Sequence, residues 1–308
     1  MDKKLIVSSS PHVFGSDTTQ GIMFDVIIAL LPCTIAGIVA FGLRAALMVF
    51  VCVASAVLAE HLWCLIMKKP TSVGDLSAVI TGLLLALCLS SALPLWMGAL
   101  GSVIAIIAVK QFFGGIGHNF VNPAIAGRII LLVSFPKYMS VYYEPFSSAV
   151  SSATPLVSKD VGLKALLLGG HSGAIGEGFA LLLIVGGIYL IIRRVISPAI
   201  PLCYILSAFL LTLIFTGSAN AALKAVLSGG IIIAAFFMAT DYTTSPKTLS
   251  GKVIFGVGCG VITVIIRQFG SMPEGASYAV LLMNILVPHI NTLTAPKPFG
   301  YKEGKKNA

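Results

Sequence analysis

The sequence contains few charged residues for its length. Of its 308 residues only 10% are charged, whereas 57% are hydrophobic and the mean hydropathy is +1.00. Soluble domains carry about 25% charged residues. The shortage of charge therefore places the chain in the class of membrane proteins. The net charge of +9 does not indicate a nucleic-acid partner, because no basic stripe interleaved with aromatic residues occurs.

The sequence also lacks the cysteine spacings that bind metals. Its six cysteines lie within apolar runs, and none forms a CxxC motif or stands at metal-ligand spacing from a histidine. We expect them to be small core residues, and we expect no metal site or iron–sulfur cluster built by this chain alone. The first ten residues have a basic start but no apolar stretch before a small-residue cleavage site, so we expect no cleavable signal peptide.

Long apolar segments make up most of the chain. A helix that crosses a bilayer needs about 20 mostly apolar residues, and by this rule the sequence predicts an all-α integral membrane protein of about ten transmembrane helices. The predicted spans are residues 22–41, 43–67, 76–93, 95–113, 123–135, 178–197, 199–216, 222–240, 252–270 and 276–293. The fifth is short and follows a glycine-rich stretch, which favours a broken or re-entrant helix there.

The basic residues predict the orientation of the chain. With both termini in the cytoplasm, the inner segments hold 14 of the 20 lysines and arginines, in agreement with the positive-inside rule. The long loop at residues 136–177 then faces outward. An odd number of spans on each side of it predicts two inverted five-helix repeats. The predicted regions are a cytoplasmic segment at 1–20, membrane halves at 21–135 and 178–293, the outer loop at 136–177 and a cytoplasmic tail at 294–308.

A polar, glycine-rich block, GGIGHNFVNPAIAGR, spans residues 114–128. Glycines allow the backbone to approach a ligand closely, and the amides of Asn119 and Asn122 offer donors and acceptors. Asn122 precedes Pro123 and is typical of a helix N-cap, whose free N–H groups favour negative charge. Arg128 ends the block. The pattern fits the lining of a site and equally a structural break where helices cross closely.

A second polar block, MATDYTTSPK, spans residues 238–247 at the end of the eighth predicted span. The Asp241 carboxylate and the neighbouring hydroxyls could hold a cation or a polar ligand. A capped cytoplasmic turn is the interpretation that this composition favours.

Two acidic residues lie within predicted spans, Asp25 in the first and Glu60 in the second. Charged groups at membrane depth are costly and usually face the protein interior or an aqueous cavity. Both residues are therefore candidates for an ion path. A neutral, hydrogen-bonded acid that fixes helix packing is the alternative interpretation.

The outer loop contains a string of small and hydroxyl residues, SAVSSATPL, at residues 148–156. Pro155 disfavours helical geometry at Thr154 and keeps that residue extended. Small neighbours leave the Thr154 hydroxyl accessible to an enzyme that modifies it. On its own, however, such a string is typical of an ordinary polar linker.

Together these segments resemble the D subunit of the Rnf complex and, more distantly, the B subunit of the sodium-pumping NADH:quinone oxidoreductase. The resemblance covers about residues 10–300 and rests on Ser10-Pro11-His12, the 114–128 block, SSATPL at 151–156 and MATDYTTSPKT at 238–248. In that family the threonine that ends a Ser/Thr-Gly-Ala-Thr motif carries FMN through a phosphoester bond. The resemblance implies this role for Thr154, with Ser151 and Ala153 matching the motif. Ser152 stands where glycine is commonest, and Ser148 where aspartate is usual.

The resemblance implies a membrane component of an ion-translocating ferredoxin:NAD oxidoreductase complex in the cell membrane of a bacterium or archaeon. The chain would not be catalytic alone; it would relay electrons across the membrane, coupled to Na⁺ or H⁺. Its partners would be the A, B, C, E and G subunits, of which the G subunit carries a second covalent FMN, and a flavin transferase. A non-covalent riboflavin is a further implied cofactor. The candidate cofactor-binding residues are Ser151, Ser152, Thr154, Asn119, Asn122, Arg128 and Asp241.

Two other functions fit the same pattern of spans. A solute channel or transporter with an inverted-repeat architecture like that of urea channels would need no redox cofactor, and fold alone does not decide between the two. A purely structural scaffold for partner subunits would tolerate the loss of Thr154. Visible flavin absorption separates the first of these from the redox function.

Overall fold

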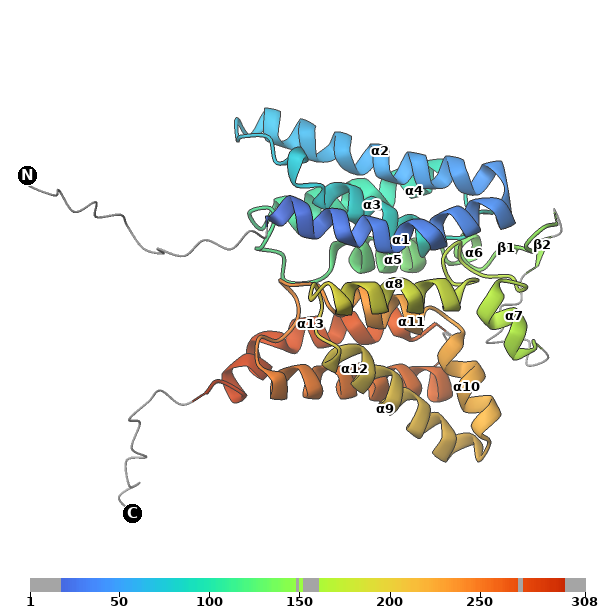
Figure 1. Ribbon diagram of the computed structural model, residues 1–308. Helices are drawn as coiled ribbons and strands as arrows, with labels where there is room; N and C mark the ends of the chain where they lie inside the picture. The colour runs from blue at the N-terminus through green and yellow to red at the C-terminus, as the bar shows by residue number, and fades with distance from the viewer. Residues whose placement is uncertain (1–17, 148–149, 152–160, 271–273, 297–308) are drawn as a thin grey trace, which may run out of the picture.

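A computed structural model describes residues 18–147, 150–151, 161–270 and 274–296, and these residues form a bundle of helices that run roughly side by side (Figure 1). The helices before the long loop are α1 (Thr19–Phe41), α2 (Leu43–Ile66), the 3-10 helix η1 (Val73–Asp75), α3 (Ser77–Leu87), α4 (Leu95–Ile104), the π-helix η2 (Ala105–Gln111) and α5 (Pro123–Ser134). Within the loop lie α6 (Pro136–Met139), the antiparallel strands β1 (Tyr142–Tyr143) and β2 (Val150–Ser151), and α7 (Leu163–Leu168). The helices after it are α8 (Ala180–Ile192), α9 (Ala199–Thr216), α10 (Ala219–Leu227), α11 (Ile231–Ile233), the π-helix η3 (Ala234–Met238), α12 (Leu249–Phe269) and α13 (Ala276–Leu293).

The helices confirm a multi-pass membrane protein, although their lengths vary. Among the described residues, α1, α2, α9, α12 and α13 are long and apolar enough to cross a membrane. The bent pair α10 and α11–η3 is either a sixth, broken span or a re-entrant loop. The remaining expected spans correspond to shorter apolar helices, namely α3, α4 with η2, α5 and α8. The third is shorter than expected because α3 ends at Leu87. The fifth is short, as the sequence indicates.

The eighth expected span is broken, which its sequence did not indicate. Helix α10 and the α11–η3 segment meet at 65°, and Gly229 and Gly230 at the break have φ of +67° and +73°. The side chain of Arg267, on α12, donates to the carbonyl oxygens of Ala225, Ser228 and Gly229 at 2.5, 3.0 and 2.9 Å. A helix break inside a membrane protein exposes backbone groups that need partners, and Arg267 supplies them.

Side-chain caps begin several helices. The Asn122 Oδ1 atom accepts hydrogen bonds from the backbone nitrogens of Ala124 and Ile125 at 3.0 and 3.3 Å, so the expected N-cap of α5 is confirmed. Thr18 caps α1 and Thr248 caps α12 in the same way. Such a cap satisfies backbone donors that the first helical turn leaves free.

Glycines allow neighbouring helices to pack closely, both across the long loop and within the part of the chain before it. A Cβ atom added at Gly186 in α8 would lie 2.3 Å from the carbonyl oxygen of Ala29 in α1. A Cβ atom at Gly82 in α3 would lie 2.7 Å from the carbonyl oxygen of Cys52 in α2. Small residues at such crossings are typical of membrane helices, whose association depends on close packing.

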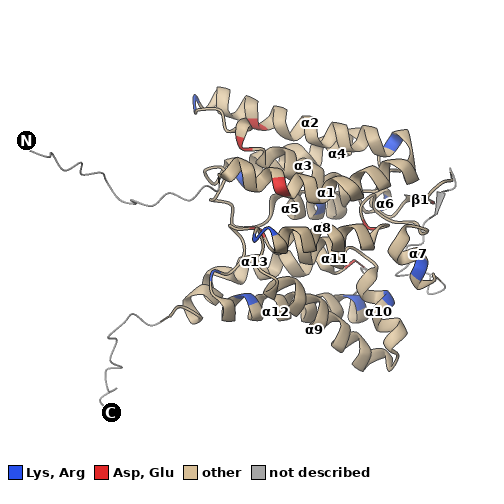
Figure 2. Cartoon of the chain, in the orientation of Figure 1, with Lys and Arg blue, Asp and Glu red and all other residues tan. Residues whose placement is uncertain are grey.

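Large apolar side chains cover the outer faces of the bundle, among them Leu43, Phe50 and Ile214, each more than two-thirds exposed. Figure 2 shows that charged residues are sparse along the helices. Such a surface suits the hydrocarbon of a bilayer.

The two ends of the bundle differ. Helix α1 begins and α13 ends at one end, whereas α7 and the β1–β2 pair lie at the other (Figure 1). The Arg44 side chain, at the start of α2, donates to the Tyr143 hydroxyl at 3.1 Å and so attaches β1 to the bundle.

Candidate functional site

A cavity of about 440 Å³ opens near the start of α1, between helices from both sides of the long loop. Its apolar walls include Ile22 and Met23 of α1, Leu84 of α3, and Phe236 and Phe237 of η3. Its polar lining includes Ser77, Thr81, Lys110, Asn119, Asn122 and Asp241. A mostly apolar cavity with a few convergent polar groups is typical of a small-molecule site.

Three of the predicted site residues meet at this cavity. The Asn119 Nδ2 atom donates to Asp241 Oδ2 at 3.3 Å and to the carbonyl oxygen of Val121 at 3.1 Å. The Asn122 Nδ2 atom donates to the carbonyl oxygen of Met238 at 3.2 Å. The two polar blocks of the sequence, more than a hundred residues apart, are therefore hydrogen-bonded to each other at the cavity wall.

The Asp241 block also forms a turn. The hydroxyl groups of Thr243 and Thr244 donate to Asp241 Oδ2 at 3.0 and 3.2 Å. This carboxylate oxygen thus accepts hydrogen bonds from its own turn and from Asn119. The block therefore forms a hydrogen-bonded turn, and this turn places Asp241 at the cavity.

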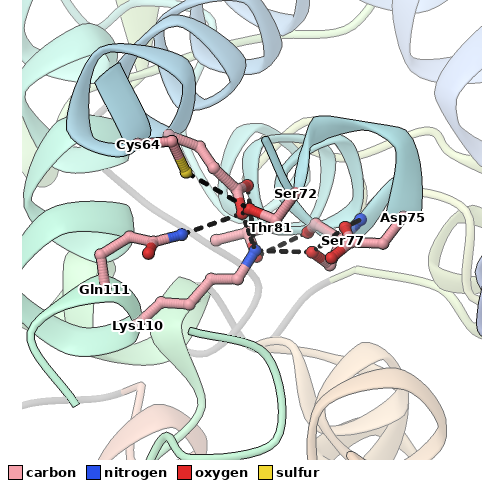
Figure 3. A network of polar contacts seen from close by, with 8 residues as sticks. Cys64, Ser72, Asp75, Ser77, Thr81, Lys110 and Gln111 are labelled. Carbon is pink, nitrogen blue, oxygen red and sulfur yellow. Dashed lines mark hydrogen bonds and ion pairs between the residues drawn. The ribbon is translucent and has the colours of Figure 1, made fainter. Parts of the chain in front are cut away.

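A buried polar network adjoins the cavity and is centred on Glu60, which is 0% exposed. The Lys110 ammonium lies 2.9 and 3.0 Å from the two carboxylate oxygens of Glu60 and donates to Ser77 Oγ at 2.5 Å. Gln111 Nε2 and Ser72 Oγ donate to Glu60 Oε1 at 2.9 and 2.5 Å. Figure 3 shows Lys110 and Gln111 reaching this network from one segment and Ser72 from another. Because Lys110 and Ser77 also line the cavity, the network and the cavity share a wall.

The π-helix η2 explains how two consecutive residues reach Glu60. Lys110 and Gln111 end this seven-residue segment, and both are buried. Short π-helical segments, which have i→i+5 hydrogen bonds, occur frequently at functional sites.

Arg128 lies away from the cavity lining, in a different buried cluster. Its NH2 atom donates to Glu274 Oε2 at 2.6 Å, and NH1 donates to Ser277 Oγ at 3.3 Å. The Tyr142 hydroxyl, on β1, donates to the other carboxylate oxygen of Glu274 at 2.9 Å. Glu177 Oε1 lies 3.8 Å from the same guanidinium. Arg128 therefore joins α5 to the start of α13, and it reaches the long loop through Glu177 and through the Glu274–Tyr142 bond.

Asp25 is paired at the edge of the bundle. Its carboxylate accepts hydrogen bonds from the Tyr189 hydroxyl at 2.9 Å and from Arg193 at 3.1 and 3.3 Å. The Arg193 side chain is 57% exposed, so this ion pair contacts the surroundings of the bundle.

The predicted flavin-attachment segment is described only in part. Ser151 lies in β2, where its backbone is opposite Tyr142 of β1. Ser152 and Thr154 lie outside the described residues.

Several residues of these clusters are not among the predicted site residues, namely Lys110, Gln111, Tyr142, Glu177 and Glu274. For one of them, Lys110, the sequence does contain a signal, because this charged residue interrupts an apolar run. A lysine near the end of an expected span usually lies at the membrane surface, however, so the sequence favours a topology role for it. In the structure Lys110 is buried against Glu60, a contact that the topology interpretation does not predict.

Comparisons with known proteins agree over nearly the whole chain. Residues 6–300 match the family described as the NQR2, RnfD, RnfE family. The chain is 45% identical to the D subunit of the Na⁺-translocating ferredoxin:NAD⁺ oxidoreductase complex of Acetobacterium woodii, across 99% of this chain and 98% of that protein. It is 39% identical to the D subunit of the proton-translocating ferredoxin:NAD⁺ oxidoreductase complex of Clostridium ljungdahlii, across 96% of each.

A third relative, more distant, is the D subunit of the ion-translocating oxidoreductase complex of Halorhodospira halophila. It is 32% identical, across 95% of this chain and 94% of that protein. The family match, over residues 6–300, includes all the described helices, the cavity and both buried clusters. The chain belongs to the NQR2, RnfD, RnfE family.

Proposed function

We propose that this chain is the D subunit of an ion-translocating ferredoxin:NAD⁺ oxidoreductase complex of the Rnf type, and that it relays electrons across the membrane. The observation that carries the proposal is the 45% identity over nearly the full length of a protein named for that activity. The partners would be the A, B, C, E and G subunits, and the chain would act only within that complex.

The proposed topology has both termini in the cytoplasm and residues 136–177 outside. In support, α1 begins and α13 ends at one end of the bundle, opposite α7 and the strand pair (Figure 1). Two inverted five-helix repeats would pair α1–α5 with α8–α13. A local similarity supports this pairing: α3 and α11 each begin directly after a residue in the left-handed region, Leu76 with φ +63° and Gly230 with φ +73°.

The outer cofactor would be FMN, joined by a flavin transferase to Thr154 through a phosphoester bond. In support, SSATPL at residues 151–156 provides the threonine, small neighbours and a following proline. The β1–β2 pairing connects this segment to the bundle three residues before Thr154. FMN would supply the redox chemistry, and the chain would set its position relative to the FMN of the G subunit.

The inner cavity suits a non-covalent flavin such as riboflavin. Its volume of about 440 Å³ lies in the range of small-molecule sites, about 300–1,000 Å³. The aromatic and aliphatic walls would contact the ring system. Lys110, Asn119, Asn122 and Asp241 would donate to and accept from its polar edge, whereas Arg128 would act elsewhere.

The ion path would include Glu60, and Asp25 is the second candidate. Glu60 is fully buried, ion-paired and adjacent to the cavity. Buried ionisable residues within membrane helices usually serve ion or proton movement. Lys110 would couple the two sites electrostatically, since its ammonium lies on the wall that they share.

The decisive experiment measures covalent flavin. The chain, co-expressed with its flavin transferase and separated on a denaturing gel, should fluoresce under ultraviolet light. Thr154→Ala should abolish the fluorescence, whereas Ser158→Ala, in the same loop, should retain it. Fluorescence that persists in Thr154→Ala would overturn the assignment of Thr154.

A further measurement separates the proposal from a channel. This chain, purified after co-expression with its flavin transferase, should absorb in the flavin bands, and the wild-type complex should take up Na⁺ or H⁺ into vesicles when reduced ferredoxin is supplied. Absence of flavin absorption would favour a solute channel instead. Normal ion uptake by Thr154→Ala would favour a structural scaffold.

A further inference from the structure

Glu177 is a buried carboxylate to which the proposed function gives no role. It lies just before α8, is 7% exposed, and packs against the break between α10 and α11, where a Cβ atom at Gly230 would lie 2.8 Å from its Oε1. None of the described groups donates a hydrogen bond to Oε1. Its Oε2 accepts a long one, 3.5 Å, from the backbone nitrogen of Ala174. An ionised carboxylate with so few donors is costly in a buried environment.

The cation nearest to Glu177 in the described cluster, Arg128, is already paired with another carboxylate. The Arg128 NH2 atom lies 2.6 Å from Glu274 Oε2 but 3.8 Å from Glu177 Oε1. The second oxygen of Glu274 accepts from the Tyr142 hydroxyl. One guanidinium thus serves two carboxylates, and in such an arrangement the less well paired carboxylate takes up the proton. Here that carboxylate is Glu177.

The other groups around Glu177 also favour its protonation. Burial raises the pKa of Glu177, and the Arg128 guanidinium opposes this rise. Arg267 directs its bonded donors to backbone carbonyls at the helix break. The other titratable groups near Glu177 and Arg128 are Cys88, Tyr142, His171, Glu274 and Tyr278.

The cluster also contains unpaired donors. The Nε atoms of Arg128 and Arg267 and the hydroxyl of Tyr278 are buried without a hydrogen-bond partner among the described groups. A metal cation would require a shell of oxygen ligands. The chemistry of Glu177 suits a proton rather than a metal cation.

We propose that Glu177 is a proton-binding group near the long loop, and that the guanidinium shared with Glu274 links its protonation to that loop. The link passes through Tyr142, which is opposite Ser151 in the strand pair, three residues before Thr154. If Thr154 carries the proposed flavin, an electron passed to it from the FMN of the G subunit would add negative charge on the loop side, and Glu177 would take up one proton from the aqueous phase there. This second step rests on the proposed flavin attachment, whereas proton binding by Glu177 does not.

Infrared difference spectroscopy on the purified complex tests proton binding directly. The spectrum between acid and alkaline pH should contain the carbonyl band of a protonated carboxylic acid. Glu177→Gln should lose this band, Glu177→Asp should keep it at a shifted frequency, and Glu144→Gln, at an exposed residue of the same loop, should keep it unchanged. A band that survives in Glu177→Gln, with the complex intact by size-exclusion chromatography, would overturn the proposal.

The redox link is tested in the same samples. The difference spectrum between oxidised and reduced complex should contain the Glu177 band in the wild type and lose it in Thr154→Ala and in Tyr142→Phe. The pH-difference band should persist in Thr154→Ala. A wild-type D chain without covalent flavin would therefore contradict the proposed function and leave the pH-difference result standing. A flavin-bearing complex whose redox spectrum lacks a Glu177-dependent band would contradict the link.

Discussion

The Lys110 ammonium contacts both carboxylate oxygens of Glu60, at 2.9 and 3.0 Å, although the two residues are 50 positions apart. Both side chains are almost inaccessible, at 4% and 0% exposure. The pair connects the end of η2 to α2 and forms part of the wall beside the cavity. Neither charge has another described counter-ion within an ion-pair distance.

Removing one member of this pair should therefore destabilise the protein more than removing both. Loss of one partner from a buried ion pair costs about 3–5 kcal/mol, because the other charge stays buried and uncompensated. We expect Glu60→Gln to lower the apparent unfolding temperature in detergent, and Glu60→Gln with Lys110→Met to restore part of the loss. Glu144→Gln, at an exposed site, is the control. A double variant no more stable than the single one would contradict this account.

The Asn122 cap should contribute measurably to stability. Its Oδ1 accepts from two backbone nitrogens of α5, and loss of such a cap costs about 1 kcal/mol. Asn122→Ala should lower the apparent unfolding temperature. Asn122→Asp retains the accepting oxygen and should lie closer to the wild type. If both variants lower the apparent unfolding temperature equally, the stabilisation comes from the hydrogen bond between Asn122 Nδ2 and the Met238 carbonyl oxygen, and not from the cap.

The crossing of α1 and α8 should not tolerate a side chain at Gly186. A Cβ atom there would lie 2.3 Å from the Ala29 carbonyl oxygen, and overpacking of this kind costs about 1–3 kcal/mol. Gly186→Ala should reduce the yield of monodisperse protein in size-exclusion chromatography. Gly162→Ala, where no atom lies within 4 Å of the added Cβ, should not. Equal yields would show that the crossing can open without cost.

His171 should make stability fall in acid. Burial lowers the pKa of this imidazole in the folded protein, and its Nδ1 lies 3.2 Å from the Ala165 carbonyl oxygen. The unfolded chain binds the proton more readily, so stability declines as the pH falls below about 6.5, the ordinary pKa of histidine. The apparent unfolding temperature, measured across this range, should depend less on pH in His171→Gln. His118→Gln, at an exposed site, should behave as the wild type.

Much of the fold was predictable, because the apolar segments and the placement of basic residues both report directly on a bilayer. The Asn122 cap was predictable for a similar reason, since a polar residue before proline has few other roles. The break between α10 and α11 was not. Its sequence, SGG between apolar runs, has the hydropathy of a continuous span, and the residue that stabilises it, Arg267, is about 40 positions later.

The lining of the candidate site was also predictable in part. Asn119, Asn122 and Asp241 stood out because polar residues beside apolar runs need partners, and they do meet at the cavity. Arg128 belongs to the same sequence block, yet it lies with Glu274 and Tyr142. Helical geometry places it about 1.7 turns beyond Asn122, and sequence alone does not specify which distant carboxylate it will contact.

The break between α10 and α11 also constrains how the protein is made. Its carbonyl groups at Ala225, Ser228 and Gly229 are satisfied by Arg267, which is synthesised about 40 residues after them. Until α12 leaves the ribosome, these carbonyls lack that partner, and unpaired backbone groups are costly in lipid. The broken segment should therefore stay in a polar environment, at the insertion machinery, until α12 joins it. Residues 219–269 would then enter the membrane as one unit.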